Sequence, residues 1–186
     1  AEYGRFSTSV TQVRTKRGTN EWSVKADNLM PGLGKGFINK FEPRLSVSGP
    51  LVRDRLLFGA YLQYRYARTP VRSLPGQPDL GLDSFDSFTR FDAVLSSRHS
   101  VVAAIVYFPR RITNATLSTF RPPEATPKFT QEGFSVGVVD RFIVSGHMVL
   151  ETTYSGRLFE VDLRTKGAAP MVYAPQSQSG NYFNRE

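Results

Sequence analysis

The stretch of sequence that decides the fold is residues 56–66, LLFGAYLQYRY. Every second residue belongs to an apolar set that ends in tyrosines: Leu56, Phe58, Ala60, Leu62, Tyr64 and Tyr66. The residues between them become polar toward the end: Leu57, Gly59, Tyr61, Gln63 and Arg65. Successive side chains of a β-strand point to opposite faces of the sheet. The pattern therefore predicts a strand with one apolar and one polar face.

The same period of two recurs along the chain, whereas apolar residues at helical spacing are nearly missing. Seven segments are predicted to be strands: 22–27, 44–51, 56–66, 87–96, 101–108, 133–142 and 147–155. Residues 181–186 could begin an eighth strand. Clusters of Gly, Pro, Asn, Asp and Ser separate these segments, as turns do between consecutive strands. We expect an all-β fold, an antiparallel meander of about 7–8 strands.

The links between the predicted strands alternate strictly in length. Tight turns are expected at residues 53–55, 97–99 and 144–146, and long links at 28–37, 67–86, 109–132 and 156–180. In an antiparallel meander this order places all tight turns at one end of the sheet and all long links at the other. Outer-membrane barrels have this arrangement, with short periplasmic turns and long extracellular loops. The meander is therefore expected to form part of a transmembrane β-barrel.

The composition excludes several classes of protein and site. The 186 residues include no Cys and two His, which excludes a disulfide scaffold, thiolate chemistry and a three-His zinc centre. The longest apolar run, VVAAIVYF at 101–108, is far shorter than the roughly 20 residues of a membrane-spanning helix. We expect no enzyme activity, no catalytic residue, no metal site and no cofactor.

Two short motifs resemble ligand sites without matching them. The GLGKG stretch at 32–36 lacks the spacing of a phosphate-binding loop, so a flexible loop is the preferred interpretation. Asp79, Asp83 and Asp86 carry oxygen ligands that suit calcium, but their spacing does not match a calcium-binding loop. We interpret them as solvated carboxylates of a long link, with a calcium site as the alternative.

The opening segment, AEYGRFSTSVTQVRTKRGTNEW at residues 1–22, carries a family resemblance. It resembles the end of the plug domain and the plug-to-barrel junction of TonB-dependent outer-membrane receptors. The similarity is to the Oar-like branch, which has a carboxypeptidase-regulatory-like N-terminal domain. The matching residues are Ala1-Glu2-Tyr3-Gly4-Arg5, Val10, Val13, Thr15-Lys16 and Gly18-Thr19-Asn20-Glu21, then Ser48-Gly49-Pro50-Leu51-Val52, Asp54, Leu57-Phe58, Arg90-Phe91-Asp92 and Gly180-Asn181-Tyr182. The chain departs from the family pattern at Thr8-Ser9, Gln12 and Arg17.

The resemblance implies a domain organisation and a function. Residues 1–20 would be the end of the plug and the junction, and residues 21–186 the N-terminal part of a barrel of about 22 strands. The chain would then be a fragment of a receptor in the bacterial outer membrane that imports a scarce ligand. TonB would act through a plug segment outside this chain, and the imported ligand is unknown. Eight strands in this order would leave two open sheet edges.

The polar parity of the predicted strands supplies the candidate ligand-binding residues. The residues expected to face the lumen and the plug are Tyr61, Gln63, Arg65, Arg90, Asp92, Glu151 and Thr153. The apolar parity is expected to meet outer-membrane lipid. Basic residues near the long links, Arg110 and Arg111 among them, are expected to pair with lipopolysaccharide phosphates.

Besides an enzyme, which the residue inventory disfavours, two other functions remain open at this point. One is a complete small outer-membrane barrel with a structural or adhesive role, in which the first and last strands would pair. The other is a soluble basic β-domain that binds nucleic acid, which the net charge of +8 permits. The basic residues are scattered and no nucleic-acid-binding motif accompanies them, so nucleic acid is not expected as a partner.

Overall fold

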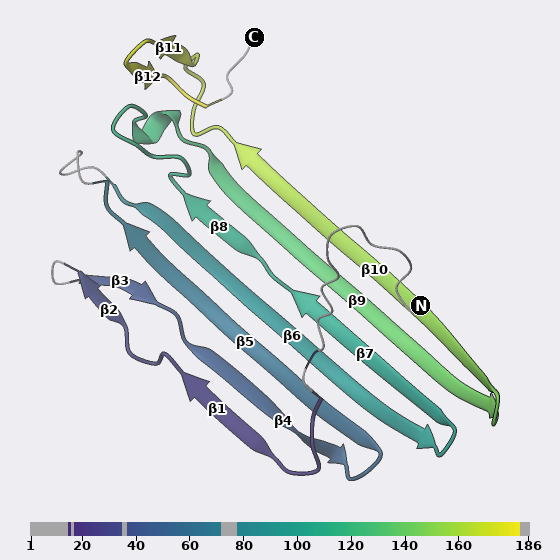
Figure 1. Ribbon diagram of the computed structural model, residues 1–186. Helices are drawn as coiled ribbons and strands as arrows, with labels where there is room; N and C mark the ends of the chain where they lie inside the picture. The colour runs from purple at the N-terminus through teal and green to yellow at the C-terminus, as the bar shows by residue number, and fades with distance from the viewer. Residues whose placement is uncertain (1–14, 16, 35–36, 72–77, 183–186) are drawn as a thin grey trace, which may run out of the picture.

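The computed structural model describes residues 15, 17–34, 37–71 and 78–182. Over these residues the chain is an antiparallel β-structure, and the predicted fold class is confirmed. Seven strands follow one another across the main sheet (Figure 1). They are β1 (Ser23–Asp27), β4 (Arg44–Val52), β5 (Leu56–Thr69), β6 (Leu80–Ser96), β7 (His99–Tyr107), β9 (Lys128–Ser145) and β10 (Met148–Arg164). These seven correspond to the seven segments predicted from the sequence.

Three further strands of this sheet were not predicted: β2 (Gly32–Gly34), β3 (Phe37–Phe41) and β8 (Arg110–Thr113). Proline accounts for two of the interruptions, since it has no amide hydrogen for a strand ladder. Pro43 separates β3 from β4, yet its carbonyl still accepts from the Tyr64 amide at 3.2 Å. Pro109 separates β7 from β8, and its carbonyl accepts from Phe85 at 3.0 Å. β3 and β8 therefore continue the lines of β4 and β7.

A small second sheet lies beyond the end of β10. It consists of β11 (Val172–Ala174) and β12 (Ser177–Ser179), next to the short 3-10 helix η1 (Pro123–Ala125) (Figure 1). Of the segment proposed as an eighth strand, Asn181 and Tyr182 are not in a strand, and residues 183–186 lie outside the described part. Within the described part of the chain, no helix has the length and apolarity needed to cross a bilayer.

The tight turns all lie at one end of the main sheet and the long links at the other, as predicted (Figure 1). The turn at residues 53–55 matches the prediction, and Asp54 adopts the left-handed conformation there, with φ 60°. The other two turns are shorter or later than expected, at residues 97–98 and 146–147. Three of the four long links are shorter than expected, because β5, β6, β9 and β10 extend well past the alternating stretches. The first link runs from residue 28 to 43 and contains β2 and β3.

The sheet has an apolar face and a polar face. Strand register places Phe58 beside Phe91 with ring centroids 5.5 Å apart, and places Tyr154 beside Val138 further along the same face. We call this side, which presents Phe58, Phe91, Val138 and Tyr154, the apolar face. The opposite side, which presents Gln63, Asp86, Arg90 and Asp92, is the polar face.

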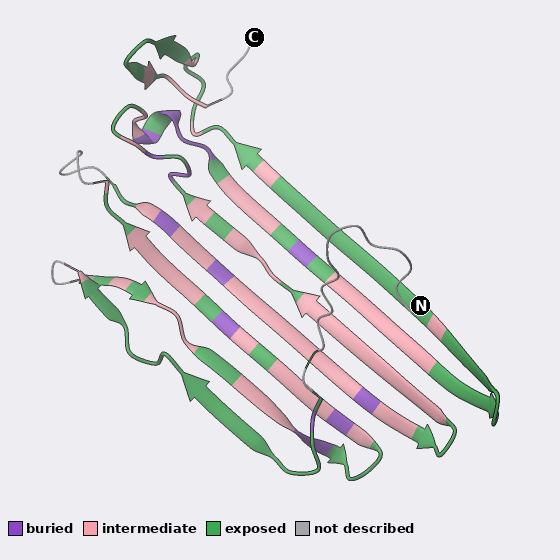
Figure 2. Cartoon of the chain, viewed as in Figure 1, coloured by how far each residue is buried: buried purple, intermediate pink, exposed green. Residues whose placement is uncertain are grey.

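Burial in this sheet is the reverse of that in a globular core. Among the described residues of the main sheet, Leu57 is the one buried large apolar side chain, whereas Gln63, Ser84 and Asp92 are buried polar residues (Figure 2). Leu158 on the apolar face is 65% exposed. The chain exposes 13534 Å² of surface. A compact monomer of 20.8 kDa would expose about 9,000 Å². The sheet is a single open layer, consistent with part of a barrel.

Candidate functional site

The polar face of β5 and β6 carries a row of linked side chains. Tyr61, Gln63 and Arg65 alternate along β5, so all three side chains stand on the same face. The Gln63 carbonyl oxygen accepts hydrogen bonds from the Tyr61 hydroxyl at 3.2 Å and from Arg65 Nη2 at 3.1 Å. Arg65 Nη2 also lies 3.4 Å from Asp86 Oδ2 on β6. The row joins a phenol, an amide, a guanidinium and a carboxylate.

Part of this row has unused hydrogen-bonding capacity. Gln63 Nε2, Ser84 Oγ and Asp86 Oδ2 are buried without a hydrogen-bond partner, although Asp86 Oδ2 keeps its charge contact with Arg65. Register places Gln63 directly opposite Asp86, and Arg65 directly opposite Ser84. A buried polar atom without a partner costs about 1–3 kcal/mol. This part of the polar face therefore holds polar atoms whose hydrogen-bonding capacity the described residues leave unused.

A second cluster holds the N-terminal segment against the sheet. Arg90 donates to both carboxylate oxygens of Asp92, at 2.9 Å and 2.7 Å, in a two-pronged ion pair. Its remaining nitrogen, Nη1, donates to the carbonyl of Thr15 at 3.2 Å and to its hydroxyl at 2.5 Å. Arg17 Nε lies 3.7 Å from Asp92, whose side chain is 6% exposed. This Arg90–Asp92 clamp binds two residues 75 positions or more away in sequence.

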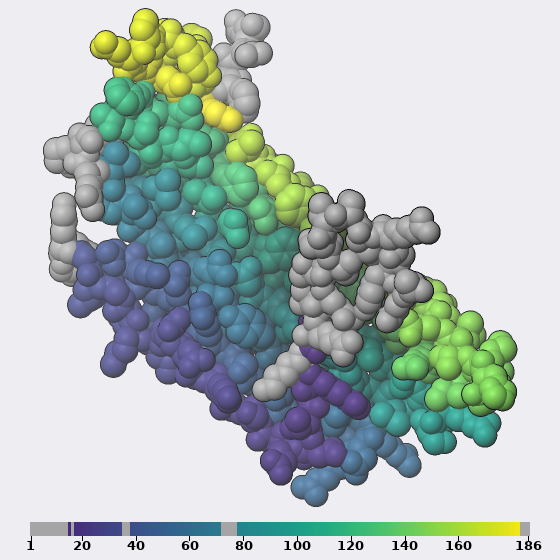
Figure 3. Space-filling model, in the orientation of Figure 1, coloured from purple at the N-terminus to yellow at the C-terminus, as the bar shows by residue number. Residues whose placement is uncertain are grey.

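The segment continues along β5 and around the tight-turn end of the sheet (Figure 3). Gly18 lies so close to the backbone of β5 that a Cβ would stand 2.5 Å from the Phe58 carbonyl oxygen. Asn20 then makes two hydrogen bonds with Asp54: its amide nitrogen donates to the carboxylate at 2.5 Å, and its carbonyl oxygen accepts from the backbone N–H at 2.9 Å. Trp22, which directly precedes β1, packs against Gly49 of β4.

Substitution of Gly18 tests this contact. We expect Gly18→Ala to lower the free energy of unfolding by about 1–3 kcal/mol, because the new methyl group would overlap the backbone of β5. The measurement is urea-induced unfolding in detergent. Gly137→Ala is the matched control, since a Cβ there meets nothing within 4 Å. An equal loss in both variants would contradict the close approach.

A hollow of about 270 Å³ lies between this segment and the sheet. It is bounded by Arg17 from the segment, Lys25 of β1, Ser46 of β4 and Tyr61 of β5. The hollow therefore adjoins the Tyr61–Gln63–Arg65 row. Cations, hydroxyl groups and a phenol border it, which suits a polar ligand.

Of the seven residues predicted to share one face, all seven do so by register. The structure brings five of them together on β5 and β6. Glu151 and Thr153 lie on β10, four strands from β5, which is about 19 Å at ordinary strand spacing. They are exposed and separate from the cluster.

Sequence reasoning missed Ser84, Asp86, Thr15 and Arg17. Asp86 shares the parity of Arg90 and Asp92, so extending the alternation of β6 toward its start would have found it. The contacts of Thr15 and Arg17 join positions far apart in the chain and carried no local signal.

The alternative that Asp79, Asp83 and Asp86 form a calcium site is wrong. Asp83 and Asp86 both belong to β6 and point to opposite faces, where Asp83 pairs with Arg68 at 3.0 Å and Asp86 lies beside Arg65. Two carboxylates on opposite faces of one strand cannot bind the same ion. In the glycine-rich motif, Gly32–Gly34 forms β2, and residues 35–36 lie outside the described part.

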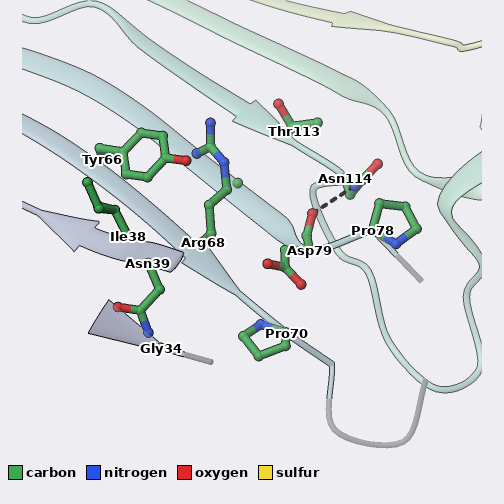
Figure 4. Close-up of a pocket in the computed structure, with 11 residues that line it drawn as sticks. Gly34, Ile38, Asn39, Tyr66, Arg68, Pro70, Pro78, Asp79, Thr113 and Asn114 are labelled. Carbon is green, nitrogen blue, oxygen red and sulfur yellow. Dashed lines mark hydrogen bonds between the residues drawn. The ribbon is translucent and has the colours of Figure 1, made fainter. Parts of the chain in front are cut away.

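A larger hollow of about 570 Å³ lies at the long-link end of the sheet (Figure 4). The Arg68 guanidinium stacks over the Tyr66 ring at 4.1 Å in this hollow. The Asn114 amide donates to the Asp79 carbonyl at 2.8 Å on its other side. Tyr66 and Arg68 lie on the apolar face, so this hollow is separate from the polar-face residues described above.

A scan against protein-family models and searches of curated proteins and of solved structures found no match for this chain.

Proposed function

We propose that this chain forms part of the barrel wall of a TonB-dependent receptor that imports a scarce ligand across the bacterial outer membrane. The observation that carries the proposal is the reversed burial of the sheet. Phe134, Tyr154 and Leu158 are exposed on the apolar face, while the amide of Gln63 and the carboxylate of Asp92 are buried on the polar face. Such an apolar surface is suited to lipid, because a protein in water rarely exposes large contiguous apolar patches.

The size of the apolar band supports a membrane role. On β9 the apolar face presents Phe134, Val136 and Val138 and reaches Phe142. This stretch of nine residues matches the roughly 9–11 residues with which a tilted strand crosses a bilayer. Asp140 interrupts the band near the tight-turn end, where it bonds His99 at 2.7 Å. The strands then extend beyond the band toward the long links.

The N-terminal segment supports the receptor in particular. In the proposed receptor the plug fills the lumen, so its last residues must cross the inner face of the wall. Thr15, Arg17 and Gly18 lie against the polar face and contact β5 and β6. The ligand would then meet the polar row Tyr61–Gln63–Arg65.

The two other functions have weaker support. In a complete small barrel β1 would pair with β10, but these are the opposite ends of the strand order among the described residues. For nucleic-acid binding the cations would need to be free. On the two central strands β5 and β6 all three arginines, Arg65, Arg68 and Arg90, are instead paired with Asp86, Asp83 and Asp92.

Cell fractionation tests the proposal. When the gene is expressed with its native flanking sequence in a Gram-negative host, we expect the protein in the outer-membrane fraction, resistant to salt extraction and released by detergent. Uptake of the imported ligand through this receptor would stop when a protonophore collapses the proton-motive force. Recovery in the soluble fraction would contradict the membrane role. Uptake that survives the protonophore would contradict energised import.

A further inference from the structure

The apolar face carries a basic hollow above its apolar band, at the long-link end. Its volume is about 600 Å³, and it is lined by Arg111 of β8, Lys128 and Thr130 of β9, Asp162 and Arg164 of β10, and Lys166 beyond β10. Four cations therefore surround a single carboxylate. In register Lys128 stands directly opposite Arg164, an arrangement of like charges that costs stability unless an anion lies between them.

The four cations differ in their partners within the described part of the chain. Arg164 is paired with Asp162 at 2.6 Å. Among the described residues, Arg111 and Lys128 form no ion pair, and both are exposed. They are thus free to bind an external anion.

Lys166 adds a fixed charge at the edge of the hollow. Its ammonium group donates to Asn114, to the Pro123 carbonyl at 2.6 Å and to the Thr126 hydroxyl at 2.7 Å. These acceptors are neutral, so they hold the charge in place without cancelling it. Burial lowers the pKa of Lys166, and the charge of Lys128 adds to this lowering while Glu124 opposes it.

The position of the hollow selects the kind of anion. Glu132 and Glu160 lie opposite each other between the basic hollow and the apolar band, and Phe134 and Leu158 begin the band two residues further on. An anion held by Arg111 and Lys128 lies on the same face as this apolar surface, with the Glu132–Glu160 pair between them. A free anion would gain nothing from that surface, whereas acyl chains attached to the anion would pack against it.

We infer that this hollow binds the phosphate of an acylated glycolipid of the outer leaflet, of the lipid A type, with its acyl chains along the apolar face. The inference rests on the proposed membrane role. It also separates two residues that the sequence had grouped. Arg111 lies opposite Asp83 on the apolar face, but Arg110 lies opposite Ser84 on the polar face. Arg110 therefore cannot reach the same lipid.

Lipid binding by the chain in detergent micelles tests the inference. The probes are diphosphoryl lipid A, the same lipid without phosphate, and inorganic phosphate, with binding followed by native mass spectrometry. We expect Arg111→Glu with Lys128→Glu to weaken diphosphoryl lipid A binding by about tenfold or more. Arg110→Glu with Arg157→Glu, on the polar face, is the charge-matched control and should bind as the unaltered chain does.

Three outcomes would overturn the inference: unchanged binding by the apolar-face variant, an equal loss in the control, or displacement of lipid A by inorganic phosphate at similar concentration. Insertion of each variant into phosphatidylcholine vesicles is measured alongside. If insertion is retained and lipid A selectivity is missing, the lipid site alone is wrong. If the unaltered chain fails to insert, the proposed function fails as well.

Discussion

Replacing Asp92 with alanine is expected to lower the free energy of unfolding by about 3 kcal/mol. Removing one partner of a buried ion pair costs about 3–5 kcal/mol, because the other charge stays buried and uncompensated. Arg90 would lose both bonds to Asp92, and its side chain is 19% exposed, which places the effect at the lower end of that range. Urea-induced unfolding in detergent measures the loss.

Two further variants separate the clamp from a general effect of charge removal. Asp162→Ala breaks an exposed pair whose arginine is 77% exposed, and should cost less than about 0.5 kcal/mol. The double variant Arg90→Met with Asp92→Leu leaves no buried charge and should be more stable than Asp92→Ala alone. Equal stability of Asp92→Ala and Asp162→Ala would contradict the role given to the clamp.

The clamp also has a local consequence. Since Arg90 binds Thr15, Asp92→Ala should raise hydrogen exchange in the residues around Arg17 and Gly18 more than in the middle of β9. Uniform protection loss along the chain would show that Asp92 stabilises the sheet as a whole and not the N-terminal segment in particular.

Replacing Val138 with arginine is expected to destabilise the chain in a bilayer by about 2–4 kcal/mol. Val138 lies within the apolar band of β9, beside Ala103 of β7 and Tyr154 of β10. Arginine on the lipid-facing side of a membrane strand costs about this much at the bilayer midplane and little near its edges. The readout is the unfolding free energy in lipid vesicles and the yield of insertion.

Val139→Arg is the matched control, since the next residue of β9 points to the polar face, beside Val102 and Thr153. The loss of unfolding free energy in Val139→Arg should stay below about 1 kcal/mol if the polar face contacts water. Equal costs for the two variants, or a larger cost at Val139, would contradict the assignment of the apolar face to lipid.

The seven strands of the main path could be predicted because each contains a stretch whose two faces meet different surroundings. The alternation at residues 56–66 predicted β5 and which of its residues lie on each face. The start of β6 was missed because charged and apolar residues there no longer alternate: Asp83 and Asp86 occupy opposite faces, and both have arginine partners. A period-two signal vanishes where both faces are polar.

The candidate site was predicted less fully than the strands. Parity alone placed Tyr61, Gln63 and Arg65 on one face, since that depends only on local geometry. Which strands are neighbours depends on pairing, so the distance of Glu151 from this row could not be read from the sequence. The close approach of Gly18 to β5 depends on the path of the chain around the turn end of the sheet.

The most direct test of the central proposal is the accessibility of spin labels along β9 in lipid vesicles. The chain has no cysteine, so single cysteines introduced at positions 134–142 each report one site. We expect even-numbered positions to contact lipid-soluble oxygen and odd-numbered positions to contact a water-soluble paramagnetic reagent, in strict alternation. Uniform access of the water-soluble reagent to all nine positions would contradict a membrane wall.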